Sequence, residues 1–156
     1  MKRTTNLLLT IAVLTGLATL APAVKDHFTV LPVVHASGCS DATLTGNYGI
    51  TWSGFATPSN STTGNEVPWA GAGVVQYDGT GNFSASWTNA LNGRILTGLT
   101  AAGTYTVNSG CTGSLSFTSG DVTDVTANIV IVGGGVEVFA IDTTAGSTLA
   151  LDLKKQ

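Results

Sequence analysis

The chain has few charged side chains. They make up 10% of its 156 residues, against about 25% in an ordinary soluble domain. The formal charge is −3, with only six Lys and Arg residues, which excludes a protein that holds nucleic acid by electrostatic attraction. The chain is also not typical of a disordered protein, because 43% of its residues are hydrophobic.

Cysteine and histidine are also scarce. The two cysteines, Cys39 and Cys111, are too few for a disulfide-dense miniprotein or a four-cysteine zinc site. The two histidines, His27 and His35, precede the region that we expect to fold. We therefore expect no Ser-His-Asp triad, no Cys-His pair and no histidine-bound zinc in the folded domain. The sequence predicts no metal site and no cofactor.

No stretch of the chain repeats apolar residues with helical spacing over three turns, which argues against a long helix. From residue 43 onward, strand-forming residues instead alternate with small polar ones. This pattern predicts eight strands, at residues 44–55, 69–77, 82–88, 94–107, 114–118, 125–132, 136–142 and 147–153.

Short turn sequences separate these strands. DGTG at 78–81, NG at 92–93 and GGG at 133–135 are hairpin signals. Eight sequential antiparallel strands close most simply into a single up-and-down β-barrel, which leaves no free sheet edge. A two-sheet β-sandwich is the alternative. In the fourth strand we expect a bend or bulge at Gly98 or Gly103.

The first 23 residues have the pattern of a secretory signal peptide. A basic start is followed by an apolar run at 7–20 and a small-x-small site at 21–23. A second cleavage site at residue 36 is the alternative, and residues 24–38 then form an arm or pro-segment before a barrel domain at 39–156. An uncleaved anchor and a lipoprotein box that ends at Cys39 compete with this interpretation. We expect a secreted, periplasmic or cell-surface protein without a membrane span after cleavage.

Export permits a disulfide between Cys39 and Cys111. Such a bridge would stabilise the fold by about 4 kcal/mol in the chain-entropy model. The alternatives are two separate thiols, or a lipidated Cys39 that leaves Cys111 free. Removal of residues 1–36 leaves three basic residues against eight acidic ones, a formal charge of −5.

Four stretches resemble a known group of proteins. They are CSDATLTGNYGI (39–50), VVQYDGTGNFSAS (74–86), GTYTVNSGCTGSLSF (103–117) and VEVFAID (136–142). The chain resembles small exported bacterial proteins of unassigned function, with barrels similar to allene oxide cyclase and related in shape to dirigent proteins and lipocalins. The resemblance implies a calycin-like β-barrel over residues 39–155. Allene oxide cyclases cyclise an oxidised fatty acid inside the barrel, but no functional residue of theirs is carried over to this chain.

Aromatic residues are candidates for lining a ligand cavity. Alternatively, they form the core of a small filled barrel. The candidate ligand-binding aromatic residues are Trp52, Trp69, Trp87 and Tyr105.

Two charged residues are further ligand-binding candidates. Arg94 is the only Arg or Lys between residue 36 and the C-terminal lysines, and a guanidinium binds carboxylates well. Glu137 shares a strand face with Phe139 and Ile141. If that face points inward, Glu137 is a carboxylate in an apolar cavity and a weak catalytic candidate. The alternatives are a surface Arg94 and a solvated Glu137.

Three functions are compatible with these features. The first is an exported barrel that binds a small apolar or amphipathic ligand without catalysis. The second is a structural or adhesive surface subunit that self-associates through its N-terminal arm. The third is a barrel enzyme of the cyclase or isomerase type, which needs an inward Glu137 or a comparable buried polar group.

Overall fold

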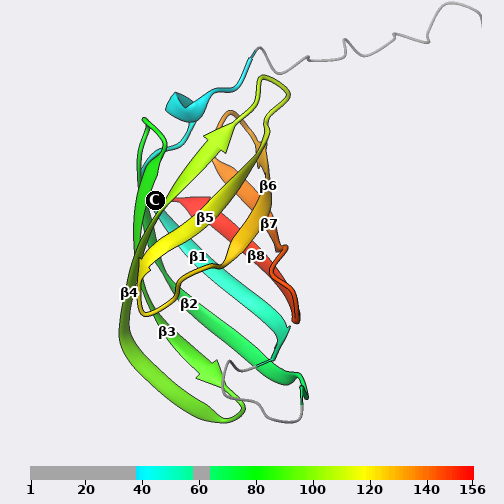
Figure 1. Cartoon of the computed structure of the whole chain (residues 1–156). Coiled ribbons are helices and arrows are strands. Elements are labelled where there is room, and N and C mark those ends of the chain that lie inside the picture. The colour runs from blue at the N-terminus through cyan, green and yellow to red at the C-terminus, as the bar shows by residue number, and fades with distance from the viewer. Residues whose placement is uncertain (1–37, 58–63) are drawn as a thin grey trace, which may run out of the picture. The chain divides into compact units, whose positions relative to one another are not determined.

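Eight antiparallel strands form a closed barrel in which each strand pairs with its neighbours in sequence and β8 pairs with β1 (Figure 1). The computed structural model describes residues 38–57 and 64–156. The elements are η1 (Asp41–Thr43), β1 (Thr45–Ala56), β2 (Val67–Asp78), β3 (Asn82–Leu91), β4 (Arg94–Val107), β5 (Thr112–Gly120), β6 (Thr126–Val132), β7 (Glu137–Asp142) and β8 (Ser147–Lys155). The structure confirms the prediction of an eight-stranded up-and-down barrel.

The expected signal peptide and N-terminal arm lie outside the described residues, as does the middle of the β1–β2 loop. Within residues 38–57 and 64–156, no helix has the length and hydrophobicity that a membrane crossing requires.

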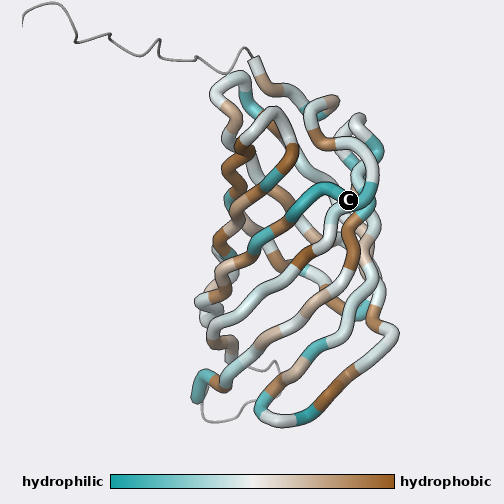
Figure 2. The backbone as a smooth tube through the Cα atoms, turned by 180° about the vertical axis from the view of Figure 1, so that it is seen from behind, coloured by the Kyte–Doolittle hydropathy of each residue, from teal (hydrophilic) through white to brown (hydrophobic). Residues whose placement is uncertain are grey.

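Alternation of side chains explains why these segments form strands with one buried face. In β6, Ala127, Ile129 and Ile131 are buried, whereas Asn128 and Val130 between them are exposed. Residues two apart share a sheet face, so the first set fills the barrel and the second faces solvent. Figure 2 shows this alternation of hydropathy along the strands.

Several strands run further than the sequence pattern predicts. β3 continues to Leu91, β5 spans nine residues, and β8 reaches Lys155. The added residues are mostly small, polar or charged, and strand pairing depends on their backbone groups rather than on their side chains. A prediction from side-chain alternation therefore makes these strands too short.

Two irregularities bend β4. They lie at Gly98 and at Gly103, the two positions that the sequence offered as alternatives for a bend or bulge. The β3–β4 register changes between the pairs Trp87–Leu99 and Asn89–Leu96, and Gly98 has φ +71. The β4–β5 register changes between Ala102 and Gly103. Extra residues at such points turn the strand and increase its twist, as closure of a small barrel requires.

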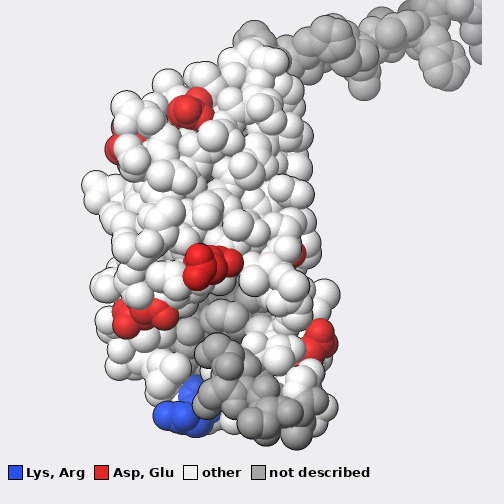
Figure 3. All heavy atoms as spheres, in the orientation of Figure 1, with Lys and Arg blue, Asp and Glu red and all other residues white. Residues whose placement is uncertain are grey.

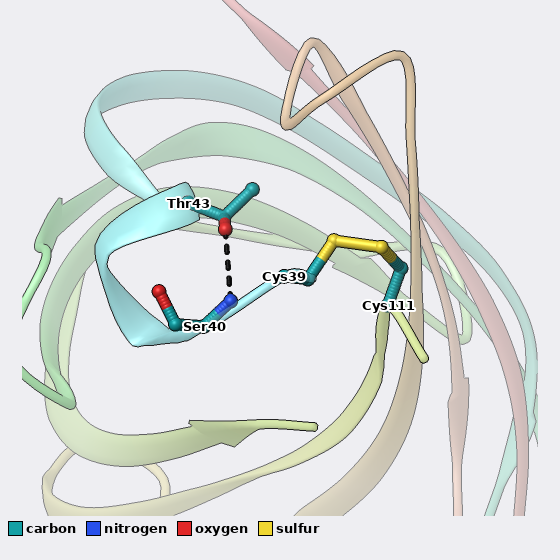
Figure 4. Close-up of a disulfide and its surroundings, with 4 residues drawn as sticks. All are labelled: Cys39, Ser40, Thr43 and Cys111. Atoms are coloured by element: carbon teal, nitrogen blue, oxygen red, sulfur yellow. Dashed lines mark hydrogen bonds between the residues drawn. A yellow bond between two sulfur atoms is a disulfide. The ribbon is translucent and has the colours of Figure 1, made fainter. Parts of the chain in front are cut away.

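The two ends of the barrel differ. We call the end with η1 and the turns that follow β2, β4 and β6 the disulfide end, and the opposite end the tryptophan end. At the disulfide end, Cys39 and Cys111 form the predicted disulfide, with Cα atoms 4.9 Å apart (Figure 4). The Ser40 N–H beside it donates to Thr43 Oγ1 and fixes the short helix.

Large side chains fill the disulfide end. Leu44 and Tyr48 are fully buried there, and Tyr77 and Tyr105 are nearly so. The Tyr105 hydroxyl lies 2.9 Å from the Asp41 carbonyl and 3.0 Å from that of Leu44. These contacts attach the N-terminal segment to the barrel and leave little room for a ligand at this end.

Candidate ligand pocket at the tryptophan end

Three tryptophans from neighbouring strands converge at the other end of the barrel. Trp52 comes from β1, Trp69 from β2 and Trp87 from β3, and all three line one pocket. The rings of Trp52 and Trp87 meet edge to face, with centroids 6.3 Å apart. These are all the tryptophans of the chain.

Two glycines on the inner face of β2 make room for these rings. A Cβ atom on Gly71 would lie 2.1 Å from Trp52 Cζ2, and one on Gly73 would lie 2.5 Å from the Cβ of Trp87. Neither glycine has a positive φ, so close approach explains them rather than backbone conformation. The pairing of β2 with β1 and β3 places each glycine directly opposite its tryptophan.

The other described residues of the pocket wall are apolar. They are Ile50, Val75, Ala85, Phe117, Val122, Val125 and Leu151. Val122 and Val125 belong to the β5–β6 loop, which bonds back to the strand through the Val125 carbonyl and the Phe117 N–H. The loop therefore forms part of the wall.

The pocket has a volume of about 60 Å³. A buried water needs roughly 10–15 Å³ on a comparable measure, whereas an apolar cavity of about 150 Å³ binds benzene. The pocket therefore admits a small apolar group as it stands, and a whole ring only if its side chains shift.

Three of the five buried side-chain atoms without a partner in the described ranges belong to residues that line this pocket. The indole Nε1 atoms of Trp52, Trp69 and Trp87 are buried and have no hydrogen-bond partner among the described residues. The same holds for Oδ1 of Asn89, whose residue is only 5% exposed. Asn89 follows Trp87 on the inner face of β3 and pairs with Gly71.

Among the residues that the structure describes, no charged side chain lines the pocket. Asp142 is the one buried carboxylate among the described residues. It accepts hydrogen bonds from the Thr144 N–H and the Ser147 hydroxyl, so it serves the β7–β8 turn. On the face in Figure 3, acidic side chains are scattered and basic ones occupy a single place.

The structure separates the six predicted ligand-binding residues. Only Trp52, Trp69 and Trp87 come together, whereas Tyr105 is hydrogen-bonded within the disulfide end. Arg94 is exposed at the start of β4, beside the β3–β4 turn, and is not in the pocket wall.

The inward placement of Glu137 is not found. Val138, Ala140 and Asp142 are the buried residues of β7, so Glu137 belongs to the outer face with Phe139 and Ile141. Its Oε1 lies 3.2 Å from Lys154 Nζ, in an ion pair with the neighbouring strand. Both faces of β7 carry apolar residues, which is why alternation did not decide between them. Glu137 is therefore not a carboxylate in an apolar cavity.

The sequence analysis did not identify two residues, Asn89 and Phe117, that lie beside the tryptophans. Asn89 continues the inner-face series of Phe83, Ala85 and Trp87 by one more step of two residues, but the predicted strand ended before it. Phe117 is brought to the pocket by β5, and its ring centroid lies 6.3 Å from that of Trp87. No local signal in the sequence predicts this contact, because it depends on barrel closure.

Within the described ranges, no group of three or more His, Cys, Asp or Glu residues is placed to hold a metal ion.

Comparison with protein-family models, curated proteins and solved structures finds no match to this chain. The resemblance to allene oxide cyclase-like barrels therefore stays a prediction.

Proposed function

We propose that this protein is an exported β-barrel that binds a small apolar ligand in the pocket at its tryptophan end, without catalysis. The observation that carries the proposal is the convergence of all three tryptophans on an apolar pocket, at the end of the barrel opposite the tyrosine-filled one. Ligand pockets are typically apolar concavities with a few polar groups. The disulfide supports export, because such bonds persist in oxidising compartments.

Binding can be tested without a label. Because every tryptophan lines the pocket, tryptophan emission excited selectively reports on that site alone. We expect a saturable change in emission on titration with a small apolar probe such as α-methylstyrene. Native mass spectrometry of the exported, non-reduced protein would reveal an adduct that it already carries.

A matched pair of variants locates the site. Ala85 lines the pocket, so Ala85→Leu is expected to fill the pocket and abolish the fluorescence change. Ala72 is exposed on the outer face of β2, so Ala72→Leu should leave the probe affinity within twofold. Equal binding by both variants and the wild type would contradict the proposal.

Self-association is a second candidate function, favoured by an apolar patch on the outer face of β6 and β7. Val130 and Phe139 are paired across the two strands and are 48% and 47% exposed. Ile141 and Val136 extend the patch. Contiguous exposed apolar surface often marks a protein–protein contact, and a second copy of the chain would cover it.

The enzyme hypothesis loses its candidate residue, since Glu137 is paired with Lys154 outside the barrel. Of the buried carboxylate and amide side chains described, Asp142 is engaged in a turn and Asn89 has no titratable proton. Our proposal is therefore a binding protein.

A further inference from the structure

The polar atoms of the pocket residues that lack a partner are hydrogen-bond donors. Each of its three indole groups is a donor only, because Nε1–H has no acceptor lone pair. All three are buried without a partner in the described part of the chain. Asn89 Oδ1 adds a single unused amide position, whose oxygen and nitrogen are interchangeable by a flip.

Leaving such groups unpaired is unfavourable. More than nine in ten buried backbone polar groups in proteins have a partner, as do most buried side-chain polar atoms. Here three exceptions, Trp52, Trp69 and Trp87, line one pocket, and a fourth, Asn89, lies on β3 two residues after Trp87. Trp87 and Asn89 are 9% and 5% exposed, so bulk water does not readily serve them.

The pocket surface is almost wholly apolar, and each indole Nε1 is buried. Binding of an acceptor therefore requires a ring to tilt toward the cavity. Trp52 and Trp69 are half-buried rather than fully enclosed. Tilting also enlarges a pocket that is otherwise small for a ring.

The described part of the pocket wall carries no charge, and this determines which acceptor fits. A carboxylate would lose its hydration there without a cation to compensate. Arg94 is exposed and outside the wall, and the ion pair of Lys154 lies on the outer surface. A neutral oxygen, such as that of a ketone, aldehyde or ester, loses much less.

We propose that the pocket selects neutral, compact apolar molecules that carry a carbonyl oxygen, which accepts hydrogen bonds from the tryptophan indoles. This inference rests on the proposed binding function, because it specifies the ligand of the same site.

Three probes of similar size separate the contributions. Acetophenone and α-methylstyrene have nearly the same shape and differ in a C=O against a C=CH₂ group, and benzoate carries a charge. We expect acetophenone to bind the wild-type protein about fivefold more tightly than α-methylstyrene, the effect of one net hydrogen bond. Benzoate should bind more weakly than either.

Spectra of ¹⁵N-labelled protein give a direct readout. At least one of the three indole N–H resonances is expected to move downfield with acetophenone, as hydrogen-bond formation requires. With α-methylstyrene they should show only the ring-current shifts of a neighbouring aromatic. Equal affinities and equal shifts for both probes would overturn the carbonyl proposal but leave the apolar binding function intact.

Single substitutions identify the donors. Trp52→Phe, Trp69→Phe and Trp87→Phe each remove an N–H while keeping an aromatic ring. At least one is expected to abolish the preference for acetophenone while retaining α-methylstyrene binding. Phe117→Leu is the control, because Phe117 lines the same pocket without an N–H and should affect both probes alike.

If none of these probes binds the wild-type protein, the proposed function fails together with this inference. If the preference survives in all three Trp→Phe variants, only the assignment to the indoles is overturned. The comparison of probes on the wild-type protein remains decisive if a variant does not fold.

Discussion

In the barrel interior, single glycines and aromatic rings are paired across neighbouring strands. Gly71 receives the ring of Trp52, and Gly103 lies against Phe83, where an added Cβ would be 2.6 Å from Cζ. A glycine in a strand interior costs conformational entropy, which the packing of the opposite ring offsets. Glycine at these positions therefore leaves space for an aromatic ring inside the barrel.

Gly71→Ala is expected to destabilise the fold by about 1–3 kcal/mol, the usual cost of overpacking. The new methyl would overlap the Trp52 ring, so tryptophan emission should change as well. Urea denaturation followed by fluorescence measures both effects. In the control Gly49→Ala, the Cβ meets Gln156 Nε2 at an ordinary 3.4 Å, and we expect a change within about 0.5 kcal/mol. Equal losses in the two variants would contradict the steric argument.

The tyrosines of the disulfide end predict sensitivity to alkali. Burial raises the pKa of Tyr48, Tyr77 and Tyr105 above the ordinary 10.0, and these are all the tyrosines of the chain. Above pH 10 the unfolded chain loses phenolic protons that the folded protein retains, so the free energy of unfolding falls as the pH rises.

Absorbance at 295 nm tests this expectation. At pH 11 the folded protein should show much less phenolate than the same chain in guanidinium chloride, and its melting temperature should be below that at pH 8. Ionisation of the native protein with an ordinary pKa near 10 would contradict burial of the three rings.

Among the elements, the β2–β3 hairpin has its own electrostatic support. Asp78 at its turn accepts hydrogen bonds from both the side chain and backbone of Asn82, and from those of Thr80. These bonds hold the pKa of the Asp78 carboxyl well below its ordinary 3.8. The stabilisation is therefore present above pH 4 and is lost as acid protonates the folded carboxylate.

Asp78→Asn is expected to lower the melting temperature at pH 7 and to reduce the decline between pH 5 and pH 2. Thermal melts across that range measure both effects. Asp124→Asn serves as the control, because Asp124 is exposed and its carboxylate accepts none of the hydrogen bonds described above. A pH profile for Asp78→Asn that parallels the wild type would show that the turn does not depend on this carboxylate.

The disulfide tethers the segment before β1 to the β4–β5 turn, across a sequence separation of 72 residues. The chain-entropy model gives a stabilisation of about 4 kcal/mol for a loop of this length. The double variant Cys39→Ser/Cys111→Ser should lose up to that amount in chemical denaturation under non-reducing conditions. The reduced wild-type protein should behave like the variant, and unchanged unfolding midpoints in both would disprove the stabilising role.

The elements were largely predictable because turns and side-chain alternation are local. DGTG and GGG mark two turns of the barrel, and all eight strands were anticipated. The orientation of β7 was not, because Val138 and Phe139 are equally apolar and only the completed barrel decides which is buried. The pocket was half predicted: its tryptophans stand out by type, whereas Phe117 and Asn89 join them only through strand pairing and register.

At the scale of the whole molecule, an aromatic series connects the two ends of the barrel. It runs from Tyr77 through Phe83 and Phe117 to Trp87, with successive ring centroids 5.0–6.3 Å apart. The series begins among the buried tyrosines of the disulfide end and ends among the tryptophans, whose indole N–H groups have no partner in the described residues. We therefore expect the disulfide end to stabilise the fold and the tryptophan end to bind the ligand.

The outer patch on β6 and β7 predicts the oligomeric state. If a second copy covers it, the wild-type protein should show a mass that increases with concentration in light scattering. Phe139→Lys should then give a monomer with an unchanged melting temperature, because Phe139 faces outward. Thr104→Lys, at an exposed position of β4, is the control. A monomeric wild-type protein at all concentrations would exclude this association.

Barrel closure also determines when the fold can be completed. The strand that seals the sheet, β8, is the last of the described strands and pairs with β1, the first of them. A chain that emerges from its N-terminus, whether from a ribosome or through a translocation pore, therefore holds β1 with one side unpaired until β8 appears. Until then the chain is an open meander with two exposed edges, the state most prone to aggregate. For this protein, the interval between the appearance of the first strand and that of the last is when a chaperone would matter most.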